Sequence, residues 1–216
     1  MSEIVPDAII KYIASHDQLS DAVLDDVLRQ STETDMSAVR RETGMLLHVL
    51  TMGLGAKRVL EVGTGFGYSA LWIARALKGR GMLTTIEVDP RRAAQAQANL
   101  ERGCVGQSVN VNVGEATEIL ARLTGQFDLI FQDGDKRQYE SLLDRLVDLL
   151  RPGGVLVVDN MLWHGRVIPG YTHEESRTST ITKAVVAFTE RLIADRRLHT
   201  AIIPIGDGVT VSVKAD

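Results

Sequence analysis

The stretch TAIIPIGDGVTVSV (residues 200–213) decides the fold, because it holds two apolar runs that lie very close together in the chain. The runs cover residues 200–205 and 209–213, and only Gly206-Asp207-Gly208 separates them. A connection of three residues can close a hairpin, but it is too short to cross over between parallel strands. We therefore predict that this part of the chain forms a pair of antiparallel strands.

Before this pair, short apolar runs alternate with stretches of helical periodicity. The runs cover 59–62, 83–86, 109–113, 127–131 and 155–158, and the helical stretches cover 68–78, 91–101, 115–120 and 139–150. Apolar strands separated by helices indicate a parallel sheet covered on both faces. A loop over 160–177 and a helix over 178–195 follow. We predict an α/β fold, the Rossmann-like class I methyltransferase sheet, with seven mostly parallel strands and an antiparallel C-terminal hairpin.

Length and composition are those of one globular domain. The chain has 216 residues, of which 44% are hydrophobic and 24% are charged, and domains of this size are common. Apolar residues at helical spacing predict two short helices over 7–30 and a third over 40–51. We expect a single domain over 1–216, in which helices of the segment 1–51 pack on a Rossmann-like core formed by 57–216.

Net charge and hydropathy indicate which kinds of partner the protein can bind and in which cellular compartment it works. The net charge is −4 and no run of Lys and Arg is dense, so nothing favours nucleic-acid binding. No apolar run is long enough to span a bilayer, and the N-terminus has no basic signal region. The single Cys104 excludes an internal disulfide and a cysteine metal cluster. We expect a cytoplasmic protein without a membrane partner.

The segment VLEVGTGFGYS (59–69) has the order strand, glycine loop and helix start. Glycines let the backbone approach a ligand, and the helix N-terminus favours an anion such as a carboxylate. A dinucleotide fingerprint would need a further glycine where Tyr68 stands. Glu61 would repel a pyrophosphate, but it would attract the ammonium group of an amino-acid cofactor. The alternative is a plain strand–helix turn.

Two further signals support an amino-acid nucleoside cofactor. Glu87 ends the next predicted strand, 20 residues after Gly67, where a carboxylate can accept both ribose hydroxyls. A surface glutamate is the alternative for this position. The small residues of Gly114-Glu115-Ala116 would leave room for an adenine ring. Together the signals favour S-adenosylmethionine over a nicotinamide cofactor.

Oxygen-bearing side chains follow the fourth and fifth predicted strands. Asp133 ends the fourth, and Asp159 and Asn160 end the fifth. Neighbouring strands lie about 5 Å apart, and two carboxylates that close repel unless a cation joins them. An all-oxygen set favours Mg²⁺, or another hard cation such as Mn²⁺ or Ca²⁺. Aspartates that only cap turns are the alternative. Lys136 follows Asp133 by only three residues, which makes it a candidate general base beside this site.

Six motifs together resemble a known family. They are LEVGTGFGYSALWIA (60–74), TTIEVDP (84–90), GEA (114–116), FQDGDKRQY (131–139), RPGGVLVVDNMLWHG (151–165) and PIGDGV (204–209). They are similar to those of the cation-dependent O-methyltransferases of the catechol and caffeoyl-CoA type, particularly the small bacterial members. The resemblance extends from residue 44 to residue 214, which is most of the chain.

The resemblance implies methylation of one hydroxyl of a catechol-like, vicinal dihydroxy aromatic by a homodimeric enzyme. It implies metal binding by Asp133, Asp159 and Asn160, and proton abstraction by Lys136. The residues it assigns to S-adenosylmethionine are Val39, Glu61, Gly63, Thr64, Gly65, Ser69, Glu87, Ala116 and Asp133. Gln132 departs from the family, which has a small apolar residue there, and the second acidic residue of the animal catechol enzymes has no match.

Two other functions are possible on the same fold. An RNA methyltransferase on the same fold would need a basic stripe, and base-amine enzymes carry an N/D-P-P-Y loop where this chain has DGDK (133–136). A non-catalytic binding module would not need the metal set or Lys136.

Trp163 either stacks on the acceptor ring or anchors its loop, and His164 has no required role.

Overall fold

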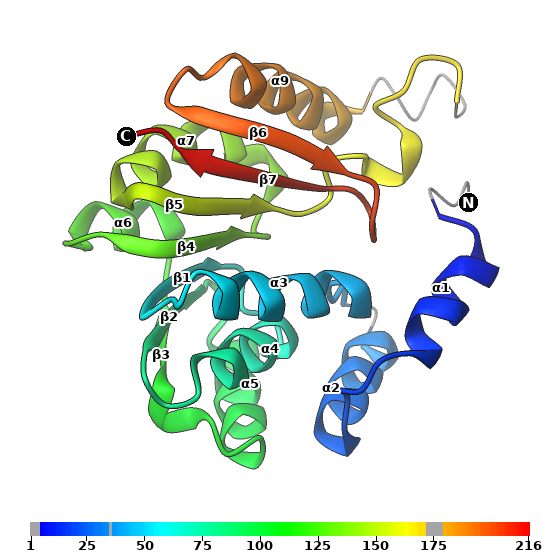
Figure 1. Ribbon diagram of the computed structural model, residues 1–216, viewed down its shortest axis with the longest axis vertical. Helices are drawn as coiled ribbons and strands as arrows, with labels where there is room; N and C mark the ends of the chain where they lie inside the picture. Colours follow the sequence, from blue (N-terminus) through cyan, green and yellow to red (C-terminus); the bar gives the residue numbers. More distant parts are fainter. Residues whose placement is uncertain (1–4, 35, 172–178) are drawn as a thin grey trace.

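The computed structural model describes residues 5–34, 36–171 and 179–216. Its sheet has seven strands in the order β3-β2-β1-β4-β5-β7-β6 (Figure 1). The strands are β1 (Arg58–Val62), β2 (Met82–Glu87), β3 (Val109–Val113), β4 (Phe127–Gln132), β5 (Leu150–Val158), β6 (Leu198–Ile203) and β7 (Val209–Lys214). The first five strands pair in parallel, and β7 is antiparallel to both β5 and β6. The predicted fold class, including the hairpin, is confirmed.

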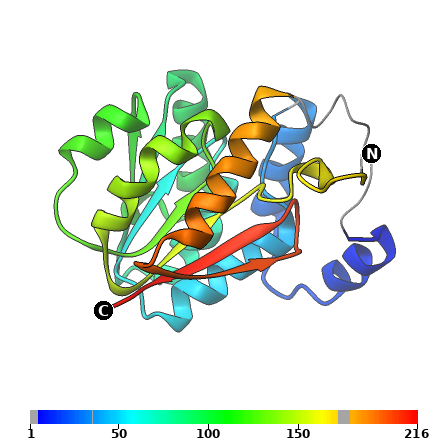
Figure 2. The ribbon, with the colours of Figure 1, turned by 90° about the horizontal axis from the view of Figure 1, so that it is seen from above.

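Helices cover both faces of the sheet (Figures 1 and 2). One face carries α2 (Ala22–Glu33), α3 (Arg41–Gly53), α4 (Tyr68–Leu77) and α5 (Pro90–Arg102), and the other carries α6 (Ala116–Arg122), α7 (Tyr139–Leu149) and α9 (Thr180–Ala194). Each layer has its own apolar cluster; the first includes Trp72, and the second includes Phe127 and Phe188. The sheet is therefore buried on both sides, as its apolar strands require.

Local sequence sets where the helices begin. Asp21 caps α2 by accepting hydrogen bonds from two backbone N–H groups, and Asp89 caps α5 in the same way ahead of Pro90. Ser179 caps α9. Such side chains satisfy donors that a helix start leaves without partners. The shorter α1 (Asp7–Ser15) has no buried residue and lies at the periphery in Figure 1.

Several boundaries differ from those predicted. Strand β6 covers 198–203 instead of 200–205, because Pro204 has no N–H to donate to the ladder. Strand β5 starts at residue 150 instead of 155, because Leu150 already pairs with Phe127 of β4; an irregularity that includes the left-handed Gly153 (φ 66°) separates this pair from Val155 opposite Leu129. The predicted helix start at residue 178 lies outside the described residues. None of the described helices has the length and apolar character needed to cross a membrane.

Candidate active site

A cavity of about 400 Å³ lies at the carboxyl ends of the parallel strands. Its walls come from the glycine loop, the ends of β2 and β3, the turn after β4 and the segment 36–39. The predicted cofactor residues that line it are Val39, Gly63, Thr64, Gly65, Ser69, Glu87, Ala116 and Asp133. Glu61 differs from this prediction, because it is fully buried and does not line the cavity.

The glycine loop needs its glycines for two reasons. Gly63, Gly65 and Gly67 have φ values of 99°, 54° and 87°, a region that side chains with a Cβ rarely adopt. A Cβ on Gly63 would also lie 2.5 Å from the carbonyl oxygen of Asp133. The close approach of the β1 and β4 ends therefore depends on Gly63.

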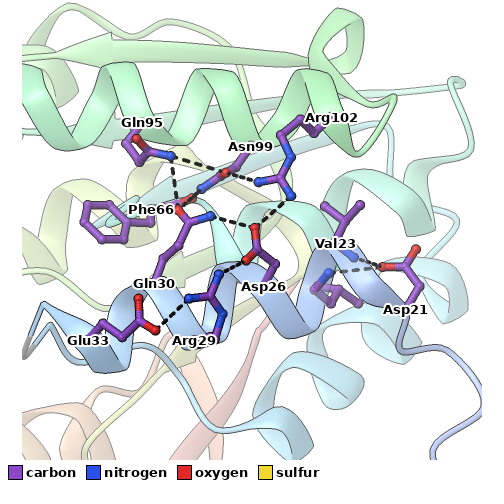
Figure 3. A network of polar contacts seen from close by, with 11 residues as sticks. Asp21, Val23, Asp26, Arg29, Gln30, Glu33, Phe66, Gln95, Asn99 and Arg102 are labelled. Atoms are coloured by element: carbon purple, nitrogen blue, oxygen red, sulfur yellow. Dashed lines mark hydrogen bonds and ion pairs between the residues drawn. The ribbon is translucent and has the colours of Figure 1, made fainter.

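A polar network holds the back of the glycine loop (Figure 3). The buried amide of Asn99 on α5 donates to the carbonyl oxygen of Phe66, at 3.0 Å, and to Oε1 of Gln30, at 3.2 Å. Gln30 in turn donates to Asp26, at 2.9 Å. Helix α2 is thus tied to the loop. The chain after α2 also lines the cavity over 36–39, so the network joins two of the elements that contribute to the cavity walls.

Glu87 is held firmly at the end of β2. Its Oε2 accepts the backbone N–H of Gly65 at 2.9 Å, and its Oε1 accepts the N–H of Asp89 at 3.0 Å. The guanidinium of Arg92, which also lines the cavity, lies 3.0 Å from Oε1. A carboxylate oxygen can accept more than one hydrogen bond, so Glu87 keeps capacity to bind hydroxyl groups in the cavity.

Glu61 lies behind the cavity. Its carboxyl group accepts a hydrogen bond from Thr85 at 2.6 Å and another from Ser69, which does line the cavity. Burial raises the pKa of Glu61 to about 7, although these hydrogen bonds oppose the shift. The carboxyl group can therefore act on a ligand only through Ser69 and its neighbours.

Replacing Glu61 with Gln should remove a pH dependence of stability. Folding raises the pKa of Glu61 from 4.5 to about 7, so its contribution to the free energy of unfolding is full below pH 4.5 and is lost as pH rises through 7. The loss should be about 3 kcal/mol. Urea unfolding between pH 4.5 and 8 measures the difference between wild type and Glu61→Gln. The exposed Glu101→Gln is the control, and parallel curves for wild type and Glu61→Gln would contradict the prediction.

The predicted metal residues meet at one edge of the sheet. Strands β4 and β5 pair in parallel with Gln132 opposite Val158, so Asp133 and Asp159 follow at adjacent strand ends. Burial and the charge of Asp133 raise the pKa of Asp159 to about 8. Burial also raises the pKa of Asp133, opposed by the nearby ammonium of Lys136. The two carboxylates therefore repel each other in a largely buried place.

Lys136 and Asn160 complete this group. The ammonium nitrogen of Lys136 lies 3.0 Å from Oδ1 of Asp133. Asn160 has a left-handed backbone with φ 62°, and its amide nitrogen donates to Oδ2 of Asp207 at 3.4 Å. In the part of the chain that the structure describes, no three His, Cys, Asp or Glu side chains form a metal site. The predicted set consists of two carboxylates and one amide.

Two residues of this region were not among the predicted site residues. Asp207 lies in the turn of the β6–β7 hairpin, where an acidic residue is typical of a turn. Arg92 lies in the first turn of α5, where a basic residue is typical of an exposed helix face. Only the strand order, which places β7 beside β5, brings Asp207 to the strand ends.

A family model described as O-methyltransferase matches residues 14–215. The chain belongs to this O-methyltransferase family. A catechol O-methyltransferase from Niastella koreensis is 35% identical to this O-methyltransferase over 189 residues, which cover 83% of each chain. A probable O-methyltransferase from Mycobacterium tuberculosis is 37% identical over 200 residues, or 90% of this chain and 85% of that one.

Solved structures extend this result to the cofactor. The O-methyltransferase TomG from Streptomyces achromogenes, solved in complex with S-adenosylmethionine, has a TM-score of 0.84 and 31% identity, and covers 97% of this chain and 96% of its own. The O-methyltransferase from Bacillus cereus in complex with S-adenosylhomocysteine has a TM-score of 0.84 and 28% identity, over 96% of this chain and 97% of its own. This O-methyltransferase is accordingly an S-adenosylmethionine-dependent enzyme.

Proposed function

We propose that this O-methyltransferase uses Mg²⁺ to methylate one hydroxyl of a catechol-like aromatic. The observation that carries the proposal is the pair of carboxylates at adjacent strand ends, the buried Asp159 and the partly buried Asp133. Asp133 also lines the 400 Å³ cavity, so the pair adjoins the place proposed for the cofactor. The catechol O-methyltransferase among the relatives supports the acceptor class.

The side chains present fit a hard divalent cation. Asp159 accepts the N–H of Asn160 at 2.7 Å, and its pKa of about 8 reflects burial beside a second carboxylate. A bound cation would relieve this repulsion. Two carboxylates and one amide oxygen suit Mg²⁺ and related cations better than Zn²⁺. Asp133, Asp159 and Asn160 would therefore hold the ion.

The chain's own residues supply the rest of the chemistry. When bound, the cation would supply positive charge that makes an acceptor hydroxyl more acidic. Lys136, at the rim of the same group, would take the proton from that hydroxyl once its amine is neutral. The cavity walls would hold the sulfonium methyl group in line with the acceptor oxygen.

The proposed cofactor residues are assigned to parts of S-adenosylmethionine from their places around the cavity. Glu87 would accept the ribose hydroxyls, the glycine loop would approach the methionine part, and Ala116 would border the adenine. The full proposed set is Val39, Gly63, Thr64, Gly65, Ser69, Glu87, Ala116 and Asp133, with Glu61 acting from behind Ser69. The fixed position of Glu87 between three donors supports its role as the ribose acceptor.

Glu87→Ala should weaken S-adenosylmethionine binding by roughly 1.5–3 kcal/mol, the range for hydrogen bonds to a charged group. The loss follows because two ribose hydroxyls would face an apolar methyl group. Titration calorimetry measures the affinity, and Glu101→Ala, an exposed position of α5 outside the cavity, is the control. Unchanged affinity would remove Glu87 from the cofactor site, and tight NADH binding would contradict the cofactor itself.

A matched pair of acceptors tests the proposed function. With methyl-labelled S-adenosylmethionine and Mg²⁺, a 1,2-dihydroxybenzene should be methylated and its 1,3 isomer should not, because only adjacent oxygens can share one cation. Product detection by mass spectrometry measures both. Equal rates for the two isomers would contradict the vicinal requirement. Labelled transfer RNA as a third acceptor tests the RNA alternative.

We also propose that the enzyme is a homodimer that uses the surface of α1. Ile9 and Tyr12 of this helix are 48% and 67% exposed, although both are large and apolar. Exposed apolar side chains gathered on one element commonly mark an interface. Light scattering should give about twice the chain mass of 23.6 kDa, and the monomer mass at micromolar concentration would contradict the proposal.

A further inference from the structure

The β6–β7 hairpin turn is joined closely to the segment that follows β5. Met161 donates its N–H to the carbonyl oxygen of Gly208, and Leu162 donates to that of Asp207, both at 2.9 Å. A Cβ on Gly208 would lie 2.4 Å from Cγ of Leu162. The turn and the segment 160–165 therefore form one unit, although they are about forty residues apart in the chain.

Both carboxylate oxygens of Asp207 bind this segment. Oδ1 accepts the backbone N–H of His164 and lies 3.4 Å from Nδ1 of the same residue. Oδ2 accepts the amide nitrogen of Asn160 at 3.4 Å. The segment needs such support, since Asn160, Trp163 and His164 all have left-handed φ values of 62°, 44° and 55°. Residues with a Cβ adopt that region at a cost.

The hydrogen bond between Asp207 and Asn160 determines which end of the Asn160 amide is turned toward the strand ends. An asparagine amide has one end that only donates and one end that only accepts. The donor end points to Asp207, so the oxygen is the end left free to bind a cation held by the carboxylates of Asp133 and Asp159. A cation can use the oxygen but not the NH₂ group.

We propose that Asp207 is a positioning residue, which orients the Asn160 amide toward the cation site and holds the 163–165 turn. This role rests on the proposed function, in which Asp133, Asp159 and Asn160 bind the cation. Asp207 does not line the cofactor cavity. It acts through Asn160 and through the backbone of His164.

A simple charge effect must be separated from positioning. Asp207 is a third negative group near Asp133 and Asp159, and its charge acts on both of them. Removing that charge alone would weaken the attraction for any cation. A second background, Asn160→Asp, separates the two effects, because both ends of that side chain are oxygens and its orientation no longer matters.

The experiment is a Mn²⁺ titration followed by electron paramagnetic resonance, without acceptor, on four proteins: wild type, Asp207→Asn, Asn160→Asp and the double variant. Asp207→Asn should weaken Mn²⁺ binding roughly 10–100-fold, the usual effect of losing a residue that orients a metal ligand. In the Asn160→Asp background the same change should cost less than about threefold, since the coupling between the two sites is lost.

Asp195→Asn is the matched control. Its side chain is 10% exposed, as that of Asp207 is, and it accepts the N–H of Arg197 at the opposite end of β6. It should leave Mn²⁺ affinity unchanged. Calorimetry with S-adenosylmethionine confirms that each variant is folded, and Asp207→Glu replaces Asp207→Asn if the latter does not fold.

Each result decides a separate point. An equal loss in both backgrounds would assign Asp207 a charge effect and overturn the positioning role. Mn²⁺ binding by Asp207→Asn equal to that of wild type would overturn it as well. Absence of Mn²⁺ binding by folded wild type would instead overturn the proposed metal dependence, and this role with it.

Discussion

Removing divalent cations with EDTA should abolish methyl transfer, by at least about 10³-fold, while S-adenosylmethionine binding persists. A metal that stabilises developing charge contributes several kcal/mol, and about 1.4 kcal/mol corresponds to a factor of ten in rate. The glycine loop and Glu87, proposed to hold most of the cofactor, line the cavity, whereas Asp159 and Asn160 do not. Initial rates in EDTA, then with Mg²⁺ restored in excess, measure the effect.

Asp159→Ala should reproduce the effect of the chelator, and added Mg²⁺ should not restore its activity. The control is Asp144→Ala, which removes an exposed carboxylate that pairs with Arg191 and Arg197 on the surface. That control should keep its turnover, because an exposed ion pair contributes at most about 1 kcal/mol to stability. Full activity of wild type after extensive dialysis against EDTA would place the enzyme in the metal-independent branch of the fold.

Lys136→Ala should lower turnover by about 10²–10⁴-fold, the usual contribution of a general base. The expectation rests on the position of Lys136. Its ammonium nitrogen lies 3.0 Å from Oδ1 of Asp133, a proposed metal ligand, and its side chain is only 18% exposed. Single-turnover rates with saturating cofactor measure the step. Mn²⁺ affinity should not fall, because Lys136 supplies no ligand.

Two variants support the interpretation of Lys136→Ala. Lys136→Arg keeps a positive charge but cannot act as a base at neutral pH, so it should be as inactive as Lys136→Ala. Arg137→Ala removes an exposed neighbour that pairs with Asp135 and should remain active. Near-normal turnover of Lys136→Ala would show that the cation alone is enough to deprotonate the acceptor.

The fold could be predicted well because its signals are local. Three residues between two apolar runs exclude a crossover, and apolar strands alternating with helices indicate a parallel sheet. Boundaries were less predictable. The start of β5 at Leu150 depends on its pairing with Phe127 of β4, which no local pattern reveals, and Pro204 ends β6 earlier than its apolar neighbours indicate.

The site was predictable where one motif supplies both the backbone and the side chain. The glycine loop and Glu87, which the sequence predicts to bind the cofactor, do line the cavity. Glu61 does not, because alternation along β1 turns its side chain toward Thr85 and Ser69 instead of the cavity. Asp207 could not be found, since its contact with Asn160 requires the register of β7 on β5, a long-range property of the sheet.

The strand order also has a consequence for synthesis of the chain. Strand β7 fills the position between β5 and β6, although it is the last of the seven along the sequence. While the chain is still emerging from the ribosome, the glycine loop and Glu87 can already be assembled, but one side of β5 has no partner. An unpaired strand edge is prone to aggregation. Ribosome-bound chains that stop before residue 204 should therefore depend on chaperones, although they already contain every residue proposed to contact the cofactor.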